Sequence, residues 1–151
     1  MTRKEKATQL YTNGYNCAQT IIKTYEDFLG NRTQTLVDMA AGFGGGMGKL
    51  QQTCGAVTGA FMVMSSVYNH SQKASKDQLN KDIQQFARRF NNIHGKLNCA
   101  ELIEYDLKDE REHQKAKENK VFEKQCSGFI HTAIDIIEEL MQQSQQHINA
   151  I

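Results

Sequence analysis

Apolar residues recur along much of the chain at the three- and four-residue spacing of an amphipathic helix. The clearest face follows Ser75 and comprises Leu79, Ile83, Phe86, Ala87, Phe90 and Ile93. A second face lies near the C-terminus and comprises Phe129, Ile130, Ala133, Ile134, Ile137, Leu140 and Met141. This spacing is typical of helices that bury one side against a core. The pattern therefore predicts helices at both places.

Residues 53–68 form the most apolar segment of the sequence. Apolar side chains would lie on nearly all sides of a helix here, so we expect a buried central helix over about residues 53–68. A strand over residues 61–67 is the main alternative. The helical spacing on either side of it disfavours that alternative.

Capping residues and glycines set the remaining boundaries. A capping box at Thr2 predicts a first helix to about Thr12, and a second helix is expected from Cys17 to Gly30. Proline is absent, which removes the commonest helix breaker.

Three further segments complete the expected organisation. A short helix is expected over residues 34–41, followed by a loop over the glycine cluster at 42–48. Residues 106–120 are nearly all polar and should form an exposed loop or helix. We predict one all-α domain over residues 1–151, a compact multi-helix bundle around the central helix.

Composition excludes several classes of protein. The formal net charge is only +1, and 39% of residues are hydrophobic. A nucleic-acid partner would need a clustered positive field, and no stretch is apolar enough to span a membrane, so we expect neither partner. The first residues carry charges without an apolar run behind them, so a cytoplasmic location is expected. Cysteines in that compartment more often serve metal or redox chemistry than structural disulfides.

The four cysteines are the candidate chemical groups, and three of them follow a residue that commonly caps a helix. These pairs are Asn16-Cys17, Thr53-Cys54 and Asn98-Cys99, whereas Cys126 follows Gln125. At a first helical position, free backbone N–H groups and the helix dipole favour a thiolate, which is the nucleophilic and metal-binding form. Burial as ordinary small apolar residues is the alternative. We expect the sulfurs to share one site.

Several chemistries fit such a site. No CxxC pair exists, so the sequence lacks a thioredoxin motif. The leading hypothesis is redox chemistry, either as an iron–sulfur or other metal-bound electron carrier or as a thiol/disulfide oxidoreductase. A structural zinc site with four cysteine ligands and a small-molecule binding module with incidental cysteines are the alternatives. The redox partner protein is not identified, and the apolar last helix makes a homodimer plausible.

The glycines are a second feature of the sequence that could indicate a binding site. Residues 42–49 do not match a phosphate-binding loop, because the glycine spacing differs and Leu50 replaces the required Ser or Thr. Backbone N–H groups of this loop could still face an anion, a cluster or sulfur. The strip made by Gly55 and Gly59 predicts either close helix packing or a cofactor surface. The candidate cofactor-binding residues are therefore Gly44, Gly45, Gly46, Gly55 and Gly59.

Histidines supply no obvious ligand pair, because none is followed by another at i+4. His94 and His131 each lie five residues from a cysteine, so either could be an additional ligand or a proton donor. A surface position is the alternative for both.

Taken together, these motifs resemble the four-cysteine family named putative redox-active protein, of the C-GCAxxG-C-C type. The resemblance runs from about Gly14 to Leu140 and rests on Asn16-Cys17-Ala18-Gln19, the loop at 42–49, Cys54-Gly55-Ala56-x-x-Gly59, Cys99 with Glu101-Leu102-Ile103, and Cys126. It implies a redox or metal role for Cys17, Cys54, Cys99 and Cys126. The substrate and partners remain undefined by it.

Overall fold

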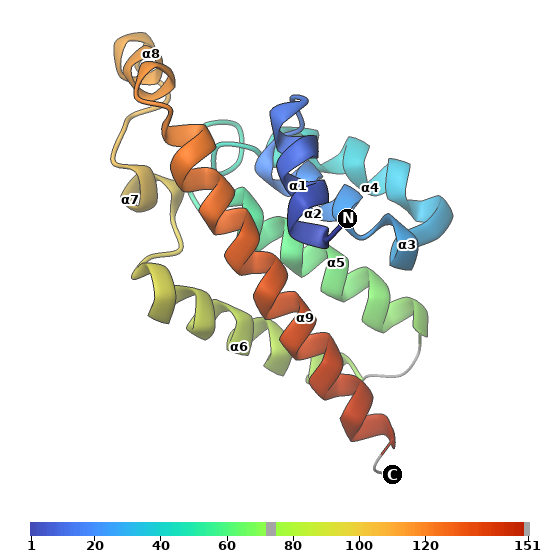
Figure 1. Ribbon diagram of the computed structural model, residues 1–151. Helices are drawn as coiled ribbons and strands as arrows, with labels where there is room; N and C mark the ends of the chain where they lie inside the picture. Colours follow the sequence, from blue (N-terminus) through green and yellow to red (C-terminus); the bar gives the residue numbers. More distant parts are fainter. Residues whose placement is uncertain (72–74, 150–151) are drawn as a thin grey trace.

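The computed structural model describes residues 1–71 and 75–149, and the regular elements of this part of the chain are helices (Figure 1). They are α1 (Arg3–Thr12), α2 (Cys17–Thr24), α3 (Glu26–Leu29), α4 (Thr33–Met39), α5 (Gly55–Ser71), α6 (Lys76–His94), α7 (Cys99–Ile103), α8 (Glu110–Glu118) and α9 (Ser127–Asn149). Short 3-10 turns follow α3 and α4, and a π-helical turn over Phe122–Cys126 precedes α9. The all-α prediction is confirmed, and the alternative strand over residues 61–67 is wrong.

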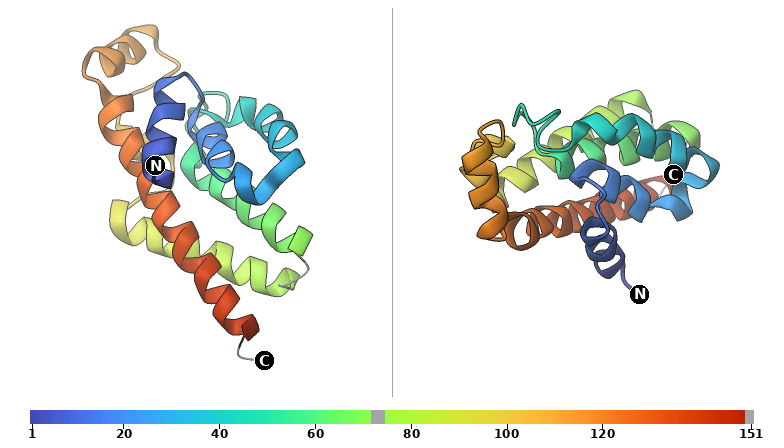
Figure 2. Two further views of the ribbon diagram at one scale, coloured as in Figure 1. Left: turned by 45° about the vertical axis from the view of Figure 1, so that its right-hand side comes forward. Right: turned by 90° about the horizontal axis from the view of Figure 1, so that it is seen from above.

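Helix α5 lies at the centre, where α2, α6 and α9 pack against it. Figure 2 shows α9 crossing the molecule beside α5 and α6, with α8 and the C-terminal end of α9 at opposite extremes. Val57, Ala60, Val63 and Met64 of α5 are fully buried, as expected for the predicted central helix. The apolar face of α9 is also buried within the chain, including Ile137.

The predicted capping residues act as such at Thr2 and Asn16, whereas Asn98 precedes α7 without a side-chain cap. Thr2 forms a capping box with Glu5 at the start of α1, and Gly95 ends α6 in the left-handed conformation. The second helix is shorter than expected from Cys17 to Gly30. It stops at Thr24 because Tyr25 leaves the helical conformation, with φ −102° and ψ 23°, before α3 begins.

Close packing of α2 against α5 depends on two glycines. A Cβ atom on Gly59 would lie 2.8 Å from the carbonyl oxygen of Ala18, and one on Gly55 would lie 2.9 Å from Cβ of Cys17. Both distances are shorter than a carbon atom tolerates, so a side chain at either position would push the helices apart. The glycine strip thus holds the N-terminal ends of α2 and α5 side by side.

Across the described residues, no helix combines the length and the apolar character needed to span a bilayer. Residues 106–120 contain α8, whose side chains are largely exposed apart from Ala116.

Candidate functional site

All four cysteines line one cavity of about 450 Å³. The lining also includes the glycine loop, Tyr11 of α1, His113 of α8, and apolar side chains from the segments around α7 and α9. Cys54, Cys99 and Cys126 are buried, whereas Cys17 is partly exposed. Residues distant in the sequence therefore meet around a single space, and each cysteine is a free thiol.

Cys17 is positioned by the cap of α2. The Asn16 side chain accepts a hydrogen bond from the backbone N–H of Gln19 at 2.9 Å, and the Gln19 side chain accepts one from the Asn16 N–H at 3.1 Å. The Asn16 amide also donates to the carbonyl groups of Ala40 and Ala41. One residue thus starts the helix that carries Cys17 and ties it to the segment before the glycine loop.

Cys54 and Cys99 are held together by a short antiparallel contact between Thr53 and Asn98. The Cys54 N–H donates to the carbonyl of Leu97 at 2.8 Å, and the Cys99 N–H donates to that of Gln52 at 2.7 Å. Because each cysteine is one residue beyond the paired positions, both lie on the same face of this contact. This face borders the cavity, since both cysteines line it.

The expectation that three cysteines occupy a first helical position is correct for two of them. Cys17 begins α2 and Cys99 begins α7, but α5 begins at Gly55. Cys54 is instead the residue that precedes the helix, and its carbonyl accepts from the N–H groups of Val57 and Thr58. Burial raises the pKa of its thiol, and the backbone N–H groups of Ala56 and Val57 partly oppose that rise.

Cys126 ends the π-helical turn over Phe122–Cys126 that leads into α9. A π-helical turn is a rare element and occurs frequently at functional sites. Here it carries Cys126, which the sequence could place only inside or at the start of the last helix. Phe122 at its other end also lines the cavity.

One wall of the cavity is a left-handed loop. The φ angles are positive at Gly45, Gly46, Met47, Gly48, Lys49 and Gln51. Gly46 is essential to this course, because a Cβ atom there would lie 2.6 Å from Cα of Gln51. The loop closes on itself through hydrogen bonds from Gly48 N–H to Gly42 and from Gln51 N–H to Gly45. Its non-glycine residues carry backbone strain of about 1–2 kcal/mol each.

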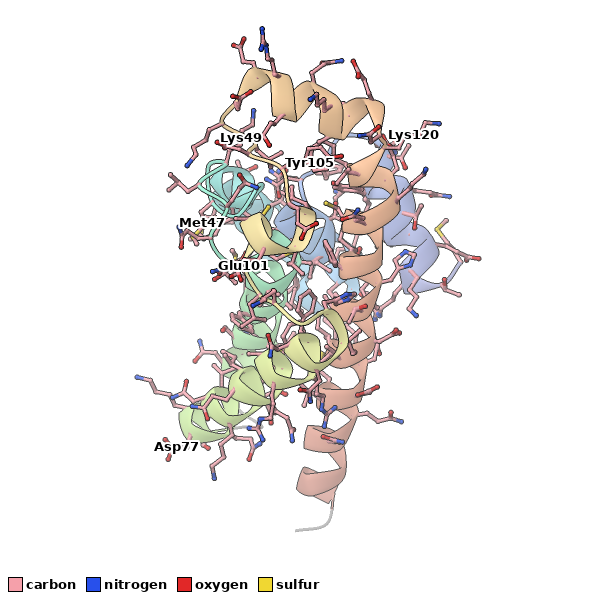
Figure 3. All side chains as sticks on the ribbon, turned by 90° about the vertical axis from the view of Figure 1, so that its left-hand side faces the viewer. Met47, Lys49, Asp77, Glu101, Tyr105 and Lys120 are labelled. Atoms are coloured by element: carbon pink, nitrogen blue, oxygen red, sulfur yellow. The ribbon has the colours of Figure 1, made fainter. Side chains whose placement is uncertain are left out.

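Gln51 connects this loop to the segment that follows α7. Its buried side-chain amide donates to the Tyr105 carbonyl at 2.7 Å and accepts from the Leu107 N–H at 2.9 Å. The same amide nitrogen lies 4.0 Å from the sulfur of Cys99. Figure 3 shows Tyr105 and Lys49 on neighbouring segments at the α8 end of the molecule. Gln51 therefore fixes two walls of the cavity relative to each other.

The thiols differ strongly in acidity. A hydrogen bond from the Cys17 thiol is the main cause that lowers the pKa of Cys126, and burial partly opposes it. That hydrogen bond and burial raise the pKa of Cys17 well above its ordinary value. Burial raises the pKa of Cys54 to about 12 and that of Cys99 to about 11. The expectation that helix starts favour thiolates is thus wrong for these three cysteines. The interaction with Cys126 followed by burial outweighs the helix end at Cys17, and burial alone is the main cause at Cys54 and Cys99.

Tyr11 is a site residue that the sequence did not single out. It lines the cavity from α1, where its hydroxyl interacts with the thiols of Cys17 and Cys126. Burial is the largest cause that raises its own pKa, so the phenol stays protonated as a donor. Only the packing of α1 beside α9 brings it there, and no local motif signals this.

The other candidates are distributed as follows. His94 lies within hydrogen-bond distance of Thr132 and His131 of Thr8, each at 2.9 Å, and neither lines the cavity. His113 does line it. Among the glycines, Gly44, Gly45, Gly46 and Gly55 line the cavity. Gly59 packs against α2 instead.

The cysteines suit metal chemistry by type, since four thiolates are the usual ligands of iron–sulfur clusters. Within the described residues, however, no three Cys, His, Asp or Glu side chains are gathered closely enough to hold one metal ion. The positions of the sulfurs thus give no support to a zinc site. A cluster spans more space than one ion, so the shared cavity still leaves room for it.

Comparison with known proteins gave one match. The family model described as "Putative redox-active protein (C_GCAxxG_C_C)" matches residues 15–140, which include all four cysteines and the glycine loop. No curated protein and no solved structure matched the chain.

Proposed function

This chain belongs to the putative redox-active protein family (C_GCAxxG_C_C), and from that premise we propose that it is a thiol/disulfide oxidoreductase that uses Cys126 and Cys17. The observation that carries the proposal is that Cys17 and Cys126 line one cavity and influence each other's acidity, since the interaction between their side chains lowers the pKa of Cys126 and raises that of Cys17. A thiol of lowered pKa and a second thiol thus border the same space. That arrangement supplies both an attacking and a resolving cysteine.

The reaction needs a substrate disulfide as the oxidant. The Cys126 thiolate attacks one sulfur of R–S–S–R, so that a mixed disulfide forms and the first R–S⁻ leaves and takes up a proton. Cys17 then loses its proton and attacks the sulfur of Cys126, which releases the second R–S⁻. The products are a Cys17–Cys126 disulfide and two RSH molecules, and two electrons have passed to the substrate. A dithiol reductant restores the cysteines by the reverse exchange.

The surroundings assist the first step. Cys17 and, to a smaller extent, the Tyr11 hydroxyl lower the pKa of Cys126, which stabilises its thiolate. Cys54 and Cys99 stay protonated at neutral pH, because burial raises the pKa of both. Attack therefore begins at Cys126 rather than at the other pair.

Trapping the mixed disulfide tests this order. Metal-free, reduced C17S protein is mixed with bis(2-hydroxyethyl) disulfide, quenched with acid and analysed by intact-mass and peptide mass spectrometry. We expect an adduct on Cys126, because the resolving thiol is missing. C126S should form no comparable adduct on Cys17. Equal adducts in both variants, or none in either, would overturn the proposed roles.

An iron–sulfur electron carrier is the second candidate, and the observation that favours it is the convergence of four cysteines on one cavity. Cys17, Cys54, Cys99 and Cys126 would hold the cluster, which would supply one-electron chemistry when bound. Anaerobic purification tests this candidate. Visible absorption that dithionite bleaches, together with bound iron and sulfide that C54S lacks, would support the cluster. Colourless protein free of iron and sulfide would remove it.

A further inference from the structure

The rim of the cysteine cavity has a one-sided charge. Apart from the cysteines and Tyr11, the ionisable side chains that line it within the described residues are Lys49 and His113, and no carboxylate is among them. Lys49 comes from the left-handed loop and His113 from α8. The pKa of His113 is lowered by burial and by the positive charges of Lys49 and Lys117. The nearby charge is therefore positive.

Lys49 is available to a ligand. It forms no ion pair with a carboxylate of the described residues, whereas Lys6 pairs with Glu26 and Lys96 with Glu101. The backbone fixes its position, because Lys49 has φ +61° and a Cβ atom on Gly45 would lie 3.2 Å from its Cα. Figure 3 shows the labelled Lys49 on this loop, toward the α8 end of the molecule. The Lys49 side chain thus extends from a closely packed loop that lines the cavity.

The remainder of the cavity is apolar. Leu102, Ile103, Leu107, Phe122 and Phe129 line it together with the sulfurs. Its volume of about 450 Å³ lies in the range of small-molecule sites. Such a space suits a compound with an apolar body near the thiols and a charged end at the rim.

From these observations we infer that the substrate is a low-molecular-weight disulfide bearing a carboxylate, whose anionic group is bound by Lys49. The inference rests on the proposed thiol/disulfide function and adds the class of substrate to it. The carboxylate would offset the loss of water around the Lys49 amine through a charge-assisted hydrogen bond. The disulfide would then face Cys126 deeper in the cavity.

Three disulfides of similar length and different charge test the inference. They are 3,3′-dithiodipropionate, bis(2-hydroxyethyl) disulfide and cystamine, which are anionic, neutral and cationic at neutral pH. Each is mixed with reduced, metal-free wild-type, K49Q or K81Q protein, and released thiol is quantified after an acid quench. Every rate is divided by the rate of the same disulfide with dithiothreitol, which removes differences in intrinsic reactivity. Lys81 is an exposed lysine of α6 that does not line the cavity, so K81Q is the matched control.

We expect wild-type and K81Q protein to prefer the anionic over the neutral disulfide by about three-fold or more, and the neutral over the cationic by a similar factor. K49Q should lose this order, and about 0.5 M salt should weaken it in the wild type. Equal normalised rates in the wild type, or a preference that K49Q retains, would overturn the inference and leave the proposed function intact. Failure of all three disulfides to react would contradict the proposed function itself.

Discussion

Cys17 and Cys126 line the same cavity, although they come from opposite ends of the sequence. The interaction between their side chains lowers the pKa of Cys126 and, together with burial, raises the pKa of Cys17. A pair of similar thiols is thereby divided into an attacking group and a resolving group.

The thiols should react with iodoacetamide in a defined order. Below about pH 9, Cys126 should be alkylated first, because its pKa is lowered and only the thiolate reacts. Cys99 and Cys54 should remain largely unmodified at about pH 8, since burial raises their pKa values to about 11 and about 12. Peptide mass spectrometry of reduced, metal-free protein measures this order. In urea all four should react alike, and faster alkylation of Cys54 in the folded protein would contradict the assignment.

Replacing Tyr11 by Phe should slow the alkylation of Cys126. The change removes a hydroxyl donor to the sulfur, so the pKa of Cys126 rises and the thiolate fraction at neutral pH falls. We expect roughly three- to ten-fold slower alkylation at neutral pH, and the pH midpoint of the reaction should move upward. Tyr15→Phe is the control, because Tyr15 packs against Lys23 and does not line the cavity. If the two variants share the wild-type profile, Tyr11 has no role in the site.

Gln51→Ala should destabilise the protein by about 1–3 kcal/mol, because the Tyr105 carbonyl and the Leu107 N–H lose their buried partner. Urea unfolding measures the change in the free energy of unfolding. The neighbouring Gln52 is exposed, so Gln52→Ala should cost little. A similar loss in both variants would show that the Gln51 side chain does not hold these segments together.

Two glycine-to-alanine substitutions should change the free energy of unfolding in opposite directions. Gly59→Ala should lower the free energy of unfolding by about 1–2 kcal/mol, because its Cβ meets the Ala18 backbone and helix propensity offsets only part of the clash. Gly128 lies in α9 and has no atom within 4 Å of an added Cβ. Gly128→Ala should therefore stabilise by roughly 0.5–1 kcal/mol. A stabilised Gly59→Ala protein would refute the close packing of α2 on α5.

Local signals in the sequence were sufficient for most helices. Asn16 with Gln19 and Ser75 with Gln78 mark helix starts through hydrogen bonds between residues three apart, so a sequence pattern contains both partners. The break at Tyr25 was missed, since no glycine or capping residue marks it. The glycine cluster indicated a loop, but its left-handed course includes Met47 and Lys49, for which sequence offers no such signal.

For the candidate site too, the sequence predicted the local features and not those that depend on distant contacts. The cysteines and most of the candidate glycines line one cavity, yet the contact between Thr53 and Asn98 that aligns two of them joins segments far apart in the sequence. The helix ends, a local effect, predicted acidic thiols. The pKa of Cys17 is instead raised mainly by its interaction with the distant Cys126, and the pKa values of Cys54 and Cys99 are raised mainly by burial. Cys126, the one cysteine without a predicted cap, is the one whose pKa is lowered. Burial and distant hydrogen bonds depend on the complete fold.

Disulfide mapping across dithiothreitol redox buffers is the most direct test of whether Cys17 and Cys126 are the redox-active pair. Metal-free protein is equilibrated anaerobically at increasing ratios of oxidised to reduced dithiothreitol, quenched by acid, alkylated and digested for mass spectrometry. We expect the first disulfide to join Cys17 to Cys126 in a two-electron step, while Cys54 and Cys99 remain thiols. Four cysteines that stay reduced at every ratio, or a first disulfide between Cys54 and Cys99, would contradict it.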